Sequence, residues 1–291
     1  MDIGISAPLC SPRASPEVVA QLGRGAEERG LNSLWLGEHV VTFEKYASVY
    51  PGRPDGKFAF PEKTGLLDIT ATLGFLAAQT STLRLGTGIR ILPQANPVYT
   101  AKEYATLDFL SNGRIEFGVG VGWSWEEFAA CGVPFEERGA RCDEYLDVIR
   151  TLWTDAVSSY EGRFYRLPKC NMSPKPVQSP TIPITIGGHS DGALRRAARY
   201  GTGWYGLSLG VEEAAPLIHR LNGFLEAEGR KPGDLRIIVG GINNPILPDK
   251  VPAYAELGVD EILVPYVRQS PKWGEHYLDS LVTFVEVART C

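Results

Sequence analysis

The feature that most constrains the fold is a pattern that repeats along the whole chain. A short apolar run is followed by a turn with glycine or proline and then by an amphipathic helix. Strands with few polar positions, each followed by a helix, indicate parallel pairing. Eight such units predict one (β/α)8 TIM barrel over residues 1–291 rather than an open sheet. The expected strands are 2–6, 32–37, 83–91, 114–120, 182–188, 203–208, 235–241 and 260–266.

Two long connections interrupt the repeat. Residues 40–65 form a long loop after the second strand, which leaves the catalytic face of a barrel and is a candidate lid. Residues 155–180 lie between the fourth helix and the fifth strand, so we expect a short hairpin packed at the opposite face. A first helix is expected after Ser15, its N-cap, and before Gly30; a later one is expected over 64–80.

His39 is the first candidate for a functional residue, since barrel active sites lie at the C-terminal ends of the strands. It follows the second strand directly and stands beside Glu38. The alternative is a histidine that only caps or hydrogen-bonds the start of a loop. The other residues expected at strand ends are Pro8, Gly88, Gly120, Gly187, Gly188, Asn243 and Tyr266.

Composition excludes several classes of function. A formal charge of −5 without a basic stripe argues against general binding to nucleic acid. No segment approaches the roughly 20 apolar residues of a membrane helix, and the N-terminus has no leader pattern, so we expect a cytoplasmic protein. Five scattered cysteines without zinc spacing predict idle thiols and no metal site.

The turn after the fifth strand is a candidate phosphate site. Gly187 and Gly188 permit a tight turn that puts His189 and Ser190 at a helix N-terminus, where free N–H groups and the helix dipole favour an anion. The alternative is a plain turn in which Ser190 or Asp191 caps the helix. Arg195 and Arg196, one turn further on, are expected at the surface.

Three stretches together resemble the bacterial luciferase-like oxidoreductase superfamily: residues 33–40, 83–132 and 183–205. The pattern looks most like the actinobacterial branch that uses the deazaflavin coenzyme F-420 (F420 below). The resemblance implies a deazaflavin cofactor, with FMN as the alternative, and a homodimer. It also implies a small-molecule substrate and, for an FMN enzyme, a partner reductase that supplies reduced flavin.

The resemblance also assigns roles to residues. It implies a backbone bulge, often with a cis peptide, at Gly88-Ile89, although an ordinary strand glycine would read the same way. It places His39 against the reactive ring carbon, where it exchanges a proton while a hydride moves. Glu38 either holds that imidazole or faces outwards. The further cofactor contacts that it implies are Val121, Glu126, Gly187, Gly188, His189 and Ser190, and its substrate-pocket residues are Pro8, Phe43 and Trp123.

Trp123 departs from the resembling sugar-phosphate dehydrogenases, which carry a glutamate at this position. The departure argues against sugar-phosphate oxidation. Trp123 and Trp125 predict either an aromatic pocket or a hydrophobic cover for the barrel mouth. We therefore expect an F420-dependent hydride-transfer enzyme. The alternatives are an FMN-dependent monooxygenase and a barrel that binds flavin without catalysis.

Overall fold

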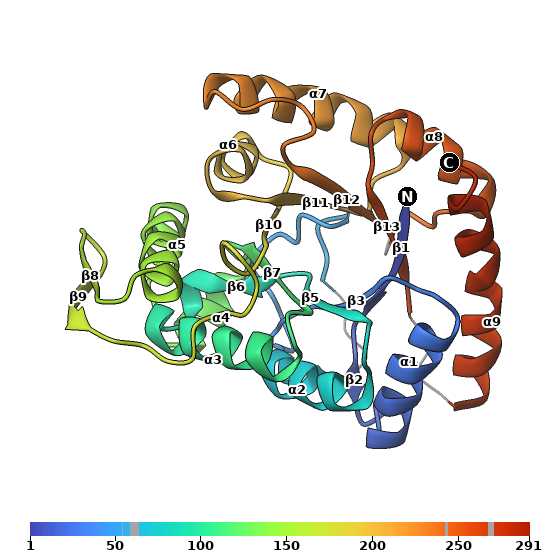
Figure 1. Ribbon diagram of the computed structural model, residues 1–291, viewed down its shortest axis with the longest axis horizontal. Helices are drawn as coiled ribbons and strands as arrows, with labels where there is room; N and C mark the ends of the chain where they lie inside the picture. Colours follow the sequence, from blue (N-terminus) through green and yellow to red (C-terminus); the bar gives the residue numbers. More distant parts are fainter. Residues whose placement is uncertain (54, 59–63, 242–243, 267–270) are drawn as a thin grey trace.

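The computed structural model describes the chain except residues 54, 59–63, 242–243 and 267–270, and it leaves the side chains of 271–273 undescribed. Eight parallel strands form a closed barrel in the order β10-β11-β12-β13-β1-β3-β5-β7, and pairing of β7 with β10 closes it (Figure 1). The predicted barrel is confirmed, while Asn243 lies outside the described residues. The barrel strands are β1 (Asp2–Ala7), β3 (Ser33–Leu36), β5 (Arg84–Thr87), β7 (Ile115–Gly120), β10 (Ile184–Gly187), β11 (Gly203–Leu207), β12 (Arg236–Gly240) and β13 (Glu261–Pro265).

Helices surround the barrel, and the main hydrophobic core lies between them and the strands. Ser15 caps α1 by accepting a hydrogen bond from the Val18 amide, as predicted, and Gly30 follows the helix end with a φ of 73°. The helices around the barrel are α1 (Pro16–Glu28), α2 (Ile69–Gln79), α3 (Pro97–Leu110), α5 (Arg138–Thr154), α6 (Asp191–Tyr200), α7 (Val211–Ala227), α8 (Val251–Glu256) and α9 (Pro271–Ala288). A 3-10 turn, η2 (Pro248–Lys250), precedes α8.

The helix expected over 64–80 begins later than predicted. Asp68 caps α2 through the Ala71 amide, so the helix starts at Ile69. The preceding β4 (Gly65–Leu66) instead pairs with β2 (Cys10–Ser11) in a small antiparallel sheet. That sheet ties the end of the long loop to the segment that follows β1.

The third barrel strand is broken in two. After β5 the peptide between Gly88 and Ile89 is cis, as expected from the resemblance, and β6 (Arg90–Ile91) resumes pairing with β7. A 3-10 turn, η1 (Leu92–Gln94), then leads to α3. The break puts Gly88 and Ile89 at the mouth of the barrel.

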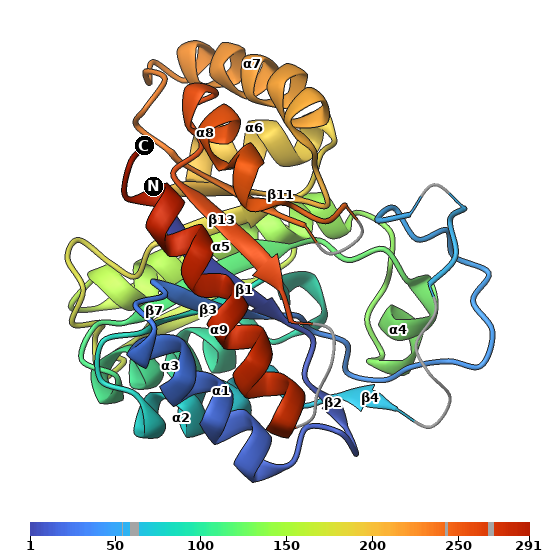
Figure 2. The ribbon, with the colours of Figure 1, turned by 90° about the vertical axis from the view of Figure 1, so that its right-hand side faces the viewer.

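One further helix, α4 (Trp125–Ala130), was not predicted; it follows β7. Figure 2 shows it at the same end of the barrel as the loop after β3, while the two chain termini lie near each other at the opposite end. The segment 155–180 contains the expected hairpin, β8 (Ser158–Glu161) and β9 (Arg166–Cys170). Within the described part of the chain, no helix combines the length and the apolar character needed to cross a membrane.

The barrel interior is filled by a small separate cluster around Trp35 and Tyr205, whose rings stack with centroids 6.1 Å apart. Gly86 is required beside Trp35, because a Cβ at this position would lie 2.4 Å from the indole. Gly88, at the top of the same stack, leaves more room, since its Cβ would meet Tyr205 at 3.4 Å. The interior therefore supports the floor of the mouth from below.

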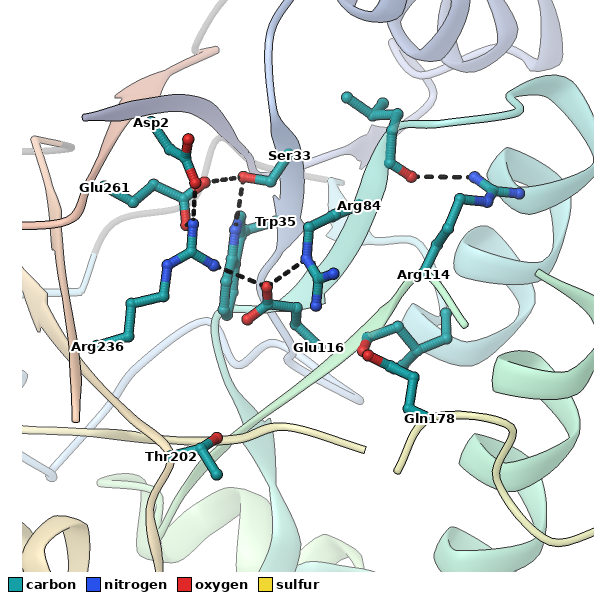
Figure 3. A network of polar contacts seen from close by, with 12 residues as sticks. Asp2, Ser33, Trp35, Arg84, Arg114, Glu116, Gln178, Thr202, Arg236 and Glu261 are labelled. Carbon is teal, nitrogen blue, oxygen red and sulfur yellow. Dashed lines mark hydrogen bonds and ion pairs between the residues drawn. The ribbon is translucent and has the colours of Figure 1, made fainter. Parts of the chain in front are cut away.

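A polar network closes the N-terminal end of the barrel (Figure 3). Its central members are Asp2, Ser33, Trp35, Arg84, Glu116, Arg236 and Glu261. Glu116 accepts hydrogen bonds from Arg84 Nε at 2.6 Å and Arg236 Nη1 at 2.9 Å. The two guanidinium groups thus neutralise a carboxylate that is buried inside the barrel.

Glu261 is the most deeply buried charge of this network, with no exposed side-chain surface. Its Oε1 accepts a hydrogen bond from Ser33, whose hydroxyl in turn accepts one from Trp35 Nε1 at 2.9 Å. Its Oε2 lies 3.3 Å from Arg236 Nη2. Burial raises the pKa of Glu261 to about 7, although Arg236 acts in the opposite direction.

Candidate active site

A cavity of about 320 Å³ opens at the C-terminal ends of the strands, where barrel enzymes carry their active sites. Its floor comes from residues at or just beyond strand ends: Pro8, Gly37, Gly88, Ile89, Ile91 and Leu207. One wall comes from the loop after β3 and the other from Gly122 and Trp123 after β7. Gly122 has a φ of 74°, and a Cβ there would lie 2.7 Å from Ile91, so this turn needs glycine.

His39 lines this cavity and is held by Glu127, the third residue of α4. Nδ1 of His39 lies 2.8 Å from Oε2 of Glu127, and the side chains are only 11% and 2% exposed. The other carboxylate oxygen accepts a hydrogen bond from the Val40 amide at 2.6 Å. Because Nδ1 must donate to the carboxylate, Nε2 is the atom through which His39 can exchange a proton with a ligand.

Glu38 neither holds the imidazole nor faces outwards, which corrects both expectations for it. Its side chain is buried and forms an ion pair with Arg90, while Oε2 accepts a hydrogen bond from the Ile91 amide. Burial raises the pKa of Glu38, and the neighbouring Arg90 opposes this shift. The carboxylate thus clamps β6 in place beyond the cis peptide.

Glu126 fastens the loop that covers the cavity. Its carboxylate accepts hydrogen bonds from the amides of Ala47 and Ser48, at 2.6 and 3.0 Å, and from the hydroxyls of Ser48 and Ser124. Desolvation would raise the pKa of Glu126, but these hydrogen bonds outweigh it and lower the pKa to about 2. Glu126 was expected to contact the cofactor. In this structure its carboxylate holds the loop.

Aromatic rings from the loop cover His39 and Trp123. The His39 ring lies 4.6 Å from that of Phe58 and 5.8 Å from that of Trp123. Tyr46 and Tyr50 pack against Trp123 at 5.3 and 5.1 Å. The aromatic pocket predicted from Trp123 is therefore present and is built largely by the loop. Trp125 lies outside it, with 48% of its surface exposed.

The described residues that line the cavity do not include three of the expected contact sites: Phe43, Val121 and the turn 187–190. Phe43 packs against Tyr46, with ring centroids 5.6 Å apart. Val121 packs against the main core. The turn 187–190 flanks the floor, since a Cβ at Gly187 would lie 2.7 Å from Ile89. The roles assigned to these residues stay predictions.

The turn after β10 has the tight glycine turn expected for a phosphate site and also the serine cap expected for a plain turn. Ser190 caps α6 by accepting a hydrogen bond from the Ala193 amide at 3.3 Å, and Gly188 has a φ of 123°. Burial lowers the pKa of His189. Arg196 was expected at the surface, but it is buried. There it binds Asp143 and the carbonyl oxygen of Gly139.

Glu127 is the candidate site residue that sequence reasoning missed. Ser124 and Glu127 have the Ser-x-x-Glu spacing of a capping box, and the Glu127 amide does donate to Ser124 Oγ at 3.3 Å. That spacing indicated a helix start, but the partner of the carboxylate lies 88 positions away in the chain. The described residues contain no group of three or more His, Cys, Asp or Glu side chains that could hold a metal, and none of the five cysteines forms a disulfide.

Fold and site together define a barrel of the oxidoreductase class, in which a histidine oriented by a buried carboxylate lies beside a glycine floor. The chain belongs to the family described as luciferase-like monooxygenases, whose sequence profile matches residues 1–243. It is 33% identical over 263 residues to the uncharacterized protein Rv0953c of Mycobacterium tuberculosis, which covers 90% of this chain and 92% of that protein.

Two further similarities concern the cofactor of a relative and the fold. The F420-dependent glucose-6-phosphate dehydrogenase of Kineococcus radiotolerans is 30% identical over 231 residues, which is 76% of this chain and 62% of that enzyme. The crystal structure of monooxygenase RslO1 from Streptomyces bottropensis superimposes with a TM-score of 0.78 at 21% identity, covering 98% and 99% of the two chains. The relatives support F420 or a flavin as the cofactor class.

Proposed function

We propose that this protein is an F420-dependent oxidoreductase that transfers a hydride between the deazaflavin ring and a small organic substrate. The observation that carries the proposal is the His39–Glu127 pair beside the Gly88-Ile89 floor of the cavity. An imidazole with one nitrogen fixed by a buried carboxylate is suited to proton exchange. Hydride transfer to or from a carbonyl requires such a partner proton.

The cavity fits a planar ring. Its floor is apolar and has no side chain at Gly37 or Gly88, so a flat ligand can approach the backbone closely. Trp35 and Tyr205 support that floor from inside the barrel. The bound deazaflavin would supply the carbon that accepts or releases the hydride. The phosphate of the cofactor is proposed to bind at the turn 187–190, beside Ile89.

His39 would accept a proton from an alcohol that is oxidised, or donate one to a carbonyl that is reduced, through Nε2. Glu127 fixes the tautomer and stabilises the imidazolium that forms. The aromatic cover from Tyr50, Phe58 and Trp123 excludes water from this centre. A tryptophan at position 123 offers no carboxylate to a sugar phosphate, so we propose a substrate other than the one named for the Kineococcus relative.

The second candidate is an FMN-dependent monooxygenase that receives reduced flavin from a partner reductase. The description of the family and the fold shared with RslO1 favour it. Both candidates use the same cavity, but only a flavin activates oxygen readily, because the deazaflavin has carbon in place of the reactive nitrogen. A barrel that binds flavin without catalysis is disfavoured by the fixed orientation of His39.

Cofactor titration tests the proposal. The purified protein is titrated with F420 and with FMN, each oxidised and reduced under anaerobic conditions, and binding is followed by tryptophan fluorescence. We expect F420 to bind at least tenfold more tightly than FMN, a difference of about 1.4 kcal/mol. A preference for reduced FMN would support the monooxygenase, and binding of neither cofactor would refute both candidates.

The assembly is also a proposal. Exposed apolar side chains on α2 and α3 support a homodimer through this face; they are Phe75, Tyr99, Phe109 and Leu110. Light scattering on the purified protein would show a mass of two chains. A cytoplasmic location stays a prediction.

A further inference from the structure

We propose that Arg53 and Tyr50 form an anion-binding subsite in the active-site cavity, which selects substrates that carry a carboxylate on a flat apolar body. Both residues line the cavity and come from the loop after β3. The inference rests on the proposed oxidoreductase function for the reaction itself. It adds the substrate class and the residue that recognises it.

Arg53 is held at the cavity by a turn that is closed by its own hydrogen bonds. The Tyr50 amide donates to the Gly56 carbonyl at 2.8 Å, and the Gly56 amide donates to the Arg53 carbonyl at 3.0 Å. Asp55 accepts from Arg53 Nη2 at 3.0 Å and from the Lys57 amide at 3.1 Å. A guanidinium positioned in this way loses less side-chain entropy when it binds a ligand.

Among the described charged residues that line the cavity, Arg53 is the one positioned to bind an anion. Glu38 is also in the lining, but both of its oxygens are used by Arg90 and the Ile91 amide. Arg53 uses one of its five N–H donors on Asp55, and the described residues show no second acceptor for it. Its side chain is 43% exposed, so a ligand in the cavity can reach it.

Tyr50 supplies the second donor of the subsite. Tyr50 lines the cavity together with Arg53, and its hydroxyl lies over Gly52, since a Cβ at that position would be 2.5 Å from it. Burial raises the pKa of Tyr50, and the charge of Arg53 opposes that shift. A carboxylate can therefore accept from the Arg53 fork and from a phenol. Both donors come from the turn that the backbone hydrogen bonds of Gly56 close.

The remaining walls specify the body of the substrate. The rings of Phe58 and Trp123 line the cavity with centroids 5.0 Å apart, and Leu66 and Ile91 add apolar surface. Stacking against such rings favours a flat, unsaturated or aromatic group. With His39 in the same lining, the expected substrate presents its reacting carbon–oxygen group to the imidazole and its carboxylate to Arg53.

Calorimetric titration with benzoate and benzamide tests the subsite, because the two probes differ mainly in charge. We expect the protein to bind benzoate about tenfold more tightly than benzamide. Arg53→Gln should abolish that preference and Arg53→Lys should retain part of it. Lys57→Gln removes the same charge from the same loop outside the lining and should keep the full preference.

A second titration separates a substrate anion from the phosphate of the cofactor. F420 and its ring system without the phosphate tail are titrated into wild type and Arg53→Gln. We expect both affinities to be unchanged. A loss of affinity for F420 alone would assign the subsite to the cofactor phosphate and overturn the substrate assignment.

The substrate assignment is also overturned if benzoate and benzamide bind equally, if neither binds at millimolar concentration, or if Lys57→Gln loses the preference as fully as Arg53→Gln. The benzoate titration needs no cofactor. Failure of the proposed function, seen as binding of neither F420 nor FMN, is therefore a separate result.

Discussion

Glu261→Gln should change the pH dependence of stability, because Glu261 is a fully buried carboxyl at the closed end of the barrel (Figure 3). Burial raises its pKa from 4.5 to about 7 in the folded protein. Each tenfold change in proton affinity is worth about 1.4 kcal/mol, so the full effect is about 3 kcal/mol. Glutamine has the same shape and carries no titrating proton.

The sign of the effect follows from the raised pKa. Between pH 4.5 and 7 the folded state binds the proton more tightly than the unfolded state. The free energy of unfolding of the wild type therefore falls as the pH rises through this window, and it levels off above pH 7. The stabilisation is fully present only below the unfolded pKa. Most of the loss, about 2–3 kcal/mol, lies between pH 5 and 8.

Urea unfolding of both proteins at several values between pH 5 and 8 measures the difference. The absolute offset includes the new contact between the amide and Arg236, so the test is the slope of the difference against pH. We expect Glu261→Gln to gain about 2–3 kcal/mol relative to wild type over this range. Glu226→Gln on the exposed side of α7 is the control and should run parallel to wild type. Parallel curves for Glu261→Gln as well would refute the reasoning.

Three further predictions concern the mouth of the barrel and the interior directly beneath it. His39→Asn should lower turnover by about 10²–10⁴ and leave cofactor affinity intact; an unchanged rate would make His39 structural. Glu127→Gln should lower turnover less and shift the pH profile of kcat, whereas a positioning role is excluded if that profile is unchanged. Gly86→Ala should lower the free energy of unfolding by about 1–3 kcal/mol through its contact with Trp35, while Gly88→Ala should change cofactor affinity with little loss of stability. Equal losses of stability would contradict the last distinction.

The barrel was predictable because its signals are local. Apolar runs, caps such as Ser15 and turn glycines report on the few residues around them, and the eight-fold repetition of the unit then restricts the topology. The helix α4 was not predicted, because a segment of six residues is too short to show a helical period. The start of α2 was misplaced because Gly65 and Leu66 pair with a segment more than 50 positions away.

The site was predictable only where one residue carries the signal. His39 could be found because a strand end in a barrel points at the active site. Its partner could not be found, because a carboxylate at a helix start is explained equally well by a cap, and no local rule connects positions 39 and 127. For the same reason Glu38, adjacent to the histidine in sequence, looked like its partner although it binds Arg90.

Two consecutive carboxylates of α4 contact, respectively, the loop that covers the cavity and the histidine that lines it. Glu126 binds loop residues 47 and 48, and Glu127 binds both the imidazole of His39 and the amide of Val40. A loop that moved away from α4 would therefore release the Val40 amide next to the histidine and withdraw the ring of Phe58. One short helix therefore both orients the imidazole and holds the loop that carries the aromatic cover. If His39 exchanges a proton as proposed, it does so beneath the rings of Phe58 and Trp123.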